Sequence, residues 1–186
     1  MRDRALLLFA AAIPIALSAQ APKIRESPAA AVSQNLGLTK VEIAYHRPAV
    51  KGRAIWGALV PYGQVWRAGA NEATTIAFSG PVKVAGHDVP AGTYGFFAIP
   101  GKERWTLILS KNAKQWGAFK YKEAEDQVRF EAVPQPAPME EWLDYSIALQ
   151  DQASATVTLS WEKLSVSFPV TADIGGLAAL KAEWKK

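Results

Sequence analysis

The sequence predicts an all-β protein, an antiparallel β-sandwich or barrel-like sandwich of about nine strands. Two observations lead to this fold. Apolar residues recur at every second position in short runs through most of the chain, and the gaps between the runs are mostly short and carry Gly, Pro, Asn or Asp. No long segment shows the helical period before residues 172–186.

The runs can be followed in order along the chain. VEIAY places Val41, Ile43 and Tyr45 on one face, and TTIAF at 74–78 repeats the pattern. A hairpin follows, with its turn expected at residues 86–88. The other predicted strands are 93–99, 105–110, 128–133, 142–149, 155–161 and 164–170.

Two segments break the strand pattern. Residues 112–126 are polar with interspersed aromatic side chains, which favours a short helix and a loop. Residues 172–186 carry Leu177, Leu180 and Trp184 at helical spacing, which predicts a short C-terminal helix. We find no internal repeat or linker, so residues 30–171 are expected to form one β-sandwich domain.

The start of the chain resembles a secretory signal peptide. Arg2 and Arg4 precede an apolar run of about 13 residues, and small residues follow at Ser18 and Ala19. This run is shorter than the roughly 20 residues of a transmembrane helix. We therefore expect residues 1–19 to be removed, residues 20–29 to form a flexible lead-in, and the protein to be secreted or periplasmic without a membrane span.

Composition and charge limit the kinds of partner and of stabilisation that the chain can have. Removing residues 1–19 takes away two arginines and one aspartate, which changes the formal net charge from +4 to +3. A balance this mild does not favour nucleic acid as a partner, because nucleic-acid binding needs dense basic patches. The chain has no cysteine, so its stability depends on a core that roughly 167 residues can supply as one domain.

Sequence motifs for catalysis and cofactor binding are missing. The chain has no G-x-S-x-G, no G-x-G-x-x-G and no P-loop, and its two histidines, His46 and His87, form no metal-binding motif. We expect no metal and no cofactor, and we favour a protein that is not an enzyme. His46 follows a predicted strand, where it is either structural or a general base.

Seven tryptophans are many for a chain of this length. Trp105 and Trp161 lie inside predicted strands, and we expect both in the core. Trp56, Trp66 and Trp116 lie in irregular segments. For these three, burial in the core and stacking against a ligand remain equally open.

The most site-like part of the chain is the segment 47–74. Its glycines and prolines exclude a regular helix, and it is too long for a turn. A loop this apolar must pack on the sandwich and satisfy its backbone polar groups there. It therefore either plugs the fold through internal ion pairs or lines a pocket.

The charges of this segment favour an anionic or carbohydrate ligand, because a planar guanidinium group can donate two parallel hydrogen bonds to the oxygens of such a ligand. We expect Arg67 and Glu72 to share one polar cluster, since Gly69 lets the chain fold back and a buried charge needs a partner. The candidate ligand-binding residues are Arg47, Lys51, Arg53, Trp66, Arg67, Asn71 and Glu72.

Four stretches of the chain carry a resemblance to a known family: YHRPAVKGRAIWGALVPYGQVWRAGANEAT, VPAGTYGFFAIPG, KNAKQWGAF and LSWEKLSVSF. In this order they resemble the bacterial family catalogued as domain of unknown function 2911. The resemblance covers roughly residues 29–170 and implies an exported, single-domain, β-rich protein. It implies no activity, substrate or cofactor. His46 stands where members of this family often have a small hydroxyl residue, which counts against a catalytic role.

Three hypotheses for the function follow. The first is an exported β-sandwich that binds a small anionic or carbohydrate ligand at the 47–74 loop. The second is a cell-envelope hydrolase that uses Glu72 with His46 or with a distant carboxylate. The third is a structural or interaction module without a small ligand. An open pocket containing Trp66, Arg67 and Glu72 would favour the first.

Overall fold

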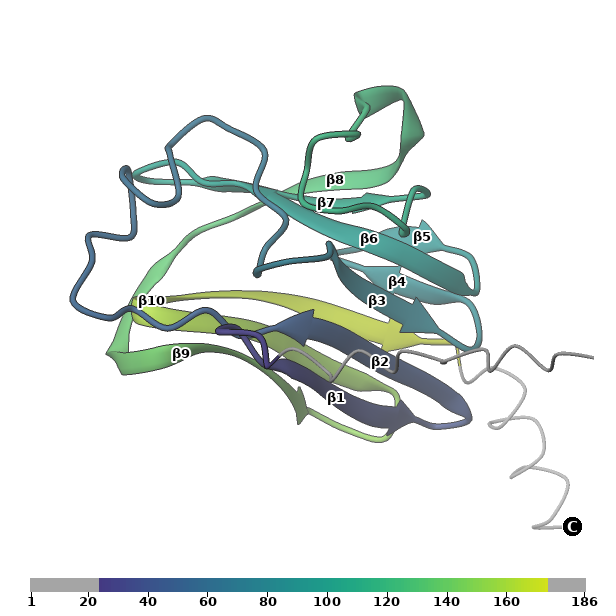
Figure 1. The fold of residues 1–186 in the computed structure, drawn as a ribbon. Helices are drawn as coiled ribbons and strands as arrows, with labels where there is room; N and C mark the ends of the chain where they lie inside the picture. The colour runs from purple at the N-terminus through teal and green to yellow at the C-terminus, as the bar shows by residue number, and fades with distance from the viewer. Residues whose placement is uncertain (1–23, 174–186) are drawn as a thin grey trace, which may run out of the picture.

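A computed structural model describes residues 24–173, and its two antiparallel sheets stack face to face (Figure 1). The predicted all-β sandwich is confirmed, with ten strands instead of about nine. The larger sheet has the order β1 (Ala29–Leu36), β2 (Thr39–His46), β3 (Thr74–Phe78), β6 (Gly92–Ile99), β7 (Trp105–Ser110) and β8 (Asp126–Ala132). The smaller sheet has the order β5 (His87–Val89), β4 (Val82–Val84), β10 (Ser154–Ala172) and β9 (Gln135–Leu149).

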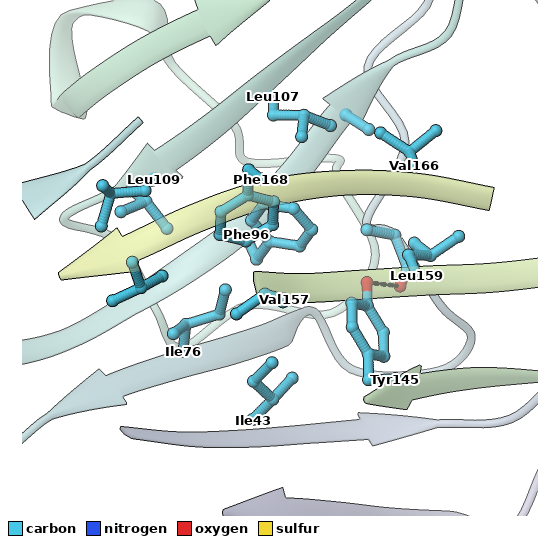
Figure 2. Close-up of a cluster of buried hydrophobic side chains, with 14 of the residues drawn as sticks. Ile43, Ile76, Phe96, Leu107, Leu109, Tyr145, Val157, Leu159, Val166 and Phe168 are labelled. Atoms are coloured by element: carbon cyan, nitrogen blue, oxygen red, sulfur yellow. Dashed lines mark hydrogen bonds between the residues drawn. The ribbon is translucent and has the colours of Figure 1, made fainter. Parts of the chain in front are cut away.

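Alternation of apolar side chains puts the core between the two sheets. Val41, Ile43 and Tyr45 of β2 point inward as predicted, and exposed or half-buried residues separate them. Phe96 of β6 meets Phe168 of β10 at the centre, with ring centroids 5.5 Å apart (Figure 2). The core is thus a continuous apolar layer contributed by both sheets.

Two local predictions differ from the structure, and one strand was not predicted. The hairpin turns at Ala85 and Gly86, whose φ angles of 48° and 86° suit a two-residue turn, so His87 already belongs to β5. The strands predicted at 155–161 and 164–170 form one strand, β10, because irregular pairing around Glu162, at φ 56°, lets it continue. The edge strand β1 has small and polar residues and lacked an apolar alternation to reveal it.

Of the two predicted helical segments, only the first lies entirely within the described residues. Within residues 112–126 the only helix is the 3₁₀ helix η1 (Glu123–Glu125); residues 112–122 form no regular helix or strand, and Asp126 begins β8. Ala172 ends β10, and the remainder of the helix predicted at 172–186 lies outside the described residues from 174 onward. The signal peptide predicted at 1–19 lies outside them too. Within residues 24–173, no helix has the length and apolar character needed to cross a membrane.

A second, smaller apolar cluster covers the outer face of the larger sheet. Phe97 and Ile108 point outward from β6 and β7 and pack with Ala73, under the irregular residues around Ala118 and Tyr121. Gly95 permits this close approach, because a Cβ there would lie 2.7 Å from the Asn112 carbonyl oxygen. Part of the segment between β7 and β8 is therefore packed against the sheet.

The irregular segment 47–73 joins β2 to β3 at one end of the sandwich (Figure 1). Its backbone is tied to three elements: Val50 N donates to Glu141 O of β9, Trp66 exchanges two hydrogen bonds with Ala98 of β6, and Ala73 N donates to Gln115 O. These bonds satisfy amides that burial would otherwise leave unpaired. The segment is a packed loop with a fixed course.

Candidate functional site

The segment 47–73 lines a pocket of about 280 Å³, which we call the loop pocket. Five of the candidate residues line it: Lys51, Arg53, Trp66, Arg67 and Asn71. Arg47 and Glu72 do not. The pocket also takes Glu26 and Ser27 from the residues before β1, and Trp161 from β10.

Four tryptophans pack together beneath this pocket. The Trp66 and Trp161 rings are stacked at an interplanar angle of 19° with centroids 6.0 Å apart, and Trp56 lies edge-on to both. Trp105 closes the cluster 4.9 Å from Trp56. Trp105 and Trp161 are buried as predicted, while Trp66 remains partly accessible on the pocket wall. Aromatic clusters of this kind are large stabilising units, so the pocket has a rigid floor.

Arg67 is the most unusual side chain of the loop pocket. It is half-buried, its Nε atom is shielded from solvent without a hydrogen-bond partner, and burial lowers the pKa of its guanidinium. Within residues 24–173 no carboxylate lies within 4 Å of it. A partly desolvated charge without a counter-charge costs free energy. Arg67 therefore carries a charge that no carboxylate of the described residues neutralises.

The turn that carries Arg67 is held firmly. The Ala68 carbonyl accepts hydrogen bonds from Thr74 Oγ1 at 3.0 Å and from the buried Tyr145 Oη at 2.7 Å. Trp66 Nε1 donates to Gly69 O at 3.1 Å. A Cβ on Gly69 would lie 2.7 Å from Thr74 Oγ1, so only glycine fits there. These hydrogen bonds fix the backbone of the turn next to Arg67.

The rim of the loop pocket is mainly basic. Lys51 Nζ lies 3.6 Å from Glu26, whose side chain is 90% exposed. Arg53 donates from Nε to Val50 O at 3.1 Å and from Nη2 to Ala49 O, which fixes its guanidinium on the loop. Three cationic side chains thus line the pocket against one exposed acid, which gives it a positive field.

Lys51, Ala68 and Asn71 adopt left-handed backbone conformations, with φ angles of 48°, 50° and 57°. These are three of the five non-glycine residues with positive φ among residues 24–173. Such conformations cost free energy and persist where the surrounding structure enforces them, often at binding sites. Their concentration around one pocket marks the loop pocket as the best candidate site.

Arg47 lies elsewhere, beside β9. Its Nε donates to Leu143 O at 2.9 Å, and its Nη2 lies 3.3 Å from Asp144. The backbone of Pro48 accepts a hydrogen bond from Leu143 N, which draws this part of the chain along the strand. Arg47 is thus engaged in joining the loop to the smaller sheet.

The expected cluster of Arg67 with Glu72 is wrong. Glu72 lines a different pocket of about 550 Å³ on the outer face of the larger sheet, which we call the outer-face pocket. There it pairs with Arg25 at 2.6 Å and lies 3.5 Å from His46 Nε2. Residue 72 forms a backbone bridge with Trp116, which commits Glu72 to this side. Arg67 and Glu72 are close in sequence but line different pockets, because the chain between them crosses from one pocket to the other.

His46 and Glu72 therefore contact each other, as the hydrolase hypothesis requires. Burial, more than any other cause, lowers the pKa of His46 below its ordinary value of 6.5. The hydrogen bond from Arg25 lowers the pKa of Glu72 below 4.5. A carboxylate with a lowered pKa is a weak base, and one already held by an arginine is less available for catalysis.

Sequence reasoning missed the residues that precede β1. Residues 20–29 were expected to be a flexible lead-in, yet Arg25, Glu26 and Ser27 all contact the 47–73 loop; Ser27 O accepts a hydrogen bond from Asn71. Nothing in their composition signals such contacts. Trp161 was expected in the core because it lies in an apolar strand. Its second role, as part of the loop-pocket wall, could not be predicted because it depends on where the 47–73 loop passes over β10.

The described residues hold no group of three or more His, Cys, Asp or Glu side chains placed to bind a metal ion.

Comparison with known families gives one finding: residues 27–170 match the family described as Protein of unknown function (DUF2911). The chain belongs to this family. Neither the curated proteins nor the solved structures give a match.

Proposed function

We propose that this protein is an exported binding protein for a small anionic ligand, which it holds in the loop pocket. The observation that carries the proposal is Arg67, a half-buried guanidinium without a carboxylate partner among residues 24–173, on a pocket that Lys51 and Arg53 also line. A bound oxyanion would supply the counter-charge that Arg67 lacks and accept hydrogen bonds from its guanidinium group.

The pocket walls indicate the rest of the ligand. Trp66 and Leu59 present apolar surface next to the cations, and Asn71 adds a neutral polar group. A volume of about 280 Å³ lies just below the range of about 300–1,000 Å³ for small-molecule sites, so the ligand is small. A small ring or short chain that carries a carboxylate or phosphate, such as an acidic sugar, matches these walls.

The export part of the proposal rests on the N-terminal sequence. The basic, apolar and small residues of positions 1–19 have the order of a secretory signal. Intact mass of the protein recovered from a bacterial expression host tests this directly. Cleavage near Ser18 or Ala19 is expected, and a mass that retains Met1 contradicts it.

The test of binding is isothermal calorimetry on the processed chain with inorganic phosphate, citrate and galacturonate, and with galactose as an uncharged control. We expect at least one anion to bind, and Arg67→Gln to weaken it by about tenfold or more, as the loss of a charge-assisted contact does. Arg104→Gln is the matched control, because it removes the same charge from an exposed pair with Glu131.

Two results would contradict the proposal. One is the absence of binding by all three anions, which would favour a structural or interaction module. The other is an equal loss of affinity in Arg67→Gln and Arg104→Gln, which would show that only the net charge matters. The hydrolase hypothesis has the His46–Glu72 contact in its favour, but the lowered pKa of Glu72 makes it the weaker candidate.

A further inference from the structure

The outer-face pocket contains an arrangement that the anion site does not explain. The Arg25 guanidinium meets three side chains at once: it donates to Glu72 Oε2 at 2.6 Å, lies 3.4 Å from His46 Nε2, and sits 5.7 Å from the centre of the Trp116 ring. Glu72, His46 and Trp116 all line the pocket, whereas Arg25 comes from the residues before β1. One cation from outside the pocket lining thus lies against all three groups.

This combination is chemically suited to a cation. A carboxylate supplies the counter-charge, and an aromatic face attracts a guanidinium or ammonium group through its quadrupole. The Trp116 side chain is 53% exposed although tryptophan is usually buried, so its ring is open to a ligand. Burial favours the neutral form of His46, which therefore does not repel a cation.

The outer-face pocket has open space beside the residues that Arg25 contacts. Its volume of about 550 Å³ falls within the range for small-molecule sites and exceeds what a guanidinium needs. The lining is rich in small side chains, which leaves this space open: Ala29, Ala30, Ala44, Ala73 and Ala113. Lys114 on the same lining could meet a negative group elsewhere on the ligand.

Arg25 is held weakly enough to be displaced. The side chains of Arg25 and Glu72 are 47% and 45% exposed, and exposed ion pairs contribute little to stability. We propose that the outer-face pocket is a second binding site, for a small ligand with a guanidinium or ammonium group, and that Arg25, which lies beside the pocket, competes with this ligand for Glu72. This goes beyond the anion site and involves different residues.

The experiment measures arginine binding to the processed chain by calorimetry, with citrulline as a neutral ligand of nearly the same shape. Removing the competitor in Arg25→Ala should tighten arginine binding by roughly fivefold, the factor expected when an exposed ion pair no longer competes. Citrulline should bind at least about tenfold more weakly than arginine, because it cannot pair with Glu72.

Further variants assign the site. In the Arg25→Ala background, Glu72→Gln should reduce arginine affinity by about tenfold and Trp116→Ala by a few-fold. Lys40→Ala is the matched control, since it breaks another exposed pair, with Glu42, and should leave arginine binding unchanged. Thermal melts of each variant confirm that it remains folded.

Several results would overturn this inference. They are no arginine binding by Arg25→Ala, equal affinity for arginine and citrulline, or an Arg25→Ala variant no tighter than the wild type. Retention of full affinity after Glu72→Gln would do the same. Arg67→Gln should leave arginine binding intact, so a failure here is distinct from a failure of the anion site.

Discussion

Arg67 and Glu72 stand five residues apart in sequence, yet they occupy opposite situations. Arg67 lines the loop pocket, half-buried and without a carboxylate partner among the described residues. Glu72 lines the outer-face pocket, half-exposed, with Arg25 and His46 beside it. The more buried charge lacks a partner and the more exposed one has two.

This difference bears on function. A protein that needed these charges only for stability would be expected to pair the buried one first, because its desolvation costs most. Instead, the turn at residues 68–71 separates two groups that could have neutralised each other. We interpret the free charge of Arg67 as reserved for a ligand, and the pair at Glu72 as a contact that can open.

The sharpest contrast between the two pockets lies in their tryptophans. Trp161→Ala should lower the free energy of unfolding by about 3–5 kcal/mol, because it empties the floor of the loop pocket in the core. Trp116→Ala should lower it by only about 0.5 kcal/mol, since its ring is mostly exposed. Urea unfolding of both variants measures the difference, and similar losses would show that the loop pocket has no rigid floor.

A smaller effect is expected where the Arg67 turn is anchored. Tyr145→Phe removes the hydrogen bond from Tyr145 Oη to Ala68 O without creating a large cavity. Its loss should lower the free energy of unfolding by about 1 kcal/mol and weaken anion binding, because Arg67 becomes less well positioned. Unchanged stability and affinity would mean that this bond does not hold the turn.

On the outer face, the expected effect depends on pH. The folded-state pKa of His46 lies below its ordinary value of 6.5, chiefly through burial and also through Arg25, while Glu72 opposes the shift. The unfolded chain therefore binds a proton more readily, and stability falls as the pH drops from about 6.5 towards the folded-state pKa.

The variant His46→Gln should flatten this part of the pH profile. Urea unfolding between pH 7 and pH 5 compares it with the wild type. The stability that the ionised Glu72 contributes is lost only at lower pH, since the pKa of Glu72 is held below 4.5. A wild-type profile as flat as that of the variant would contradict the lowered pKa of the partly buried His46.

The sandwich was predictable because its signals are local. The alternation of Val41, Ile43 and Tyr45 follows from the pleat of a strand and needs no knowledge of the rest of the chain. The same holds for Trp105 and Trp161, whose burial follows from their strands. The edge strand β1 escaped prediction because its alanines and polar residues give no such signal.

The candidate site was predictable only in part. Its location in the 47–74 loop follows from a long irregular segment that is both apolar and basic. Which charges meet depends on contacts distant in sequence: Arg47 is drawn to Leu143, and Glu72 to Arg25 and Trp116. Such pairings are set by the course of the loop over the sheets, and no pattern of neighbouring residues records them.

The most direct test of this account is urea unfolding of Arg67→Gln and the wild type, each with and without an anion that the wild type binds. Without the anion, we expect the variant to be as stable as the wild type within about 1 kcal/mol, because Arg67 has no partner to lose. With the anion at a hundred times its dissociation constant, the wild type should gain about 2.7 kcal/mol and the variant much less. A loss of about 3–5 kcal/mol in the variant without any anion, as for a broken buried ion pair, would contradict the claim that Arg67 serves a ligand.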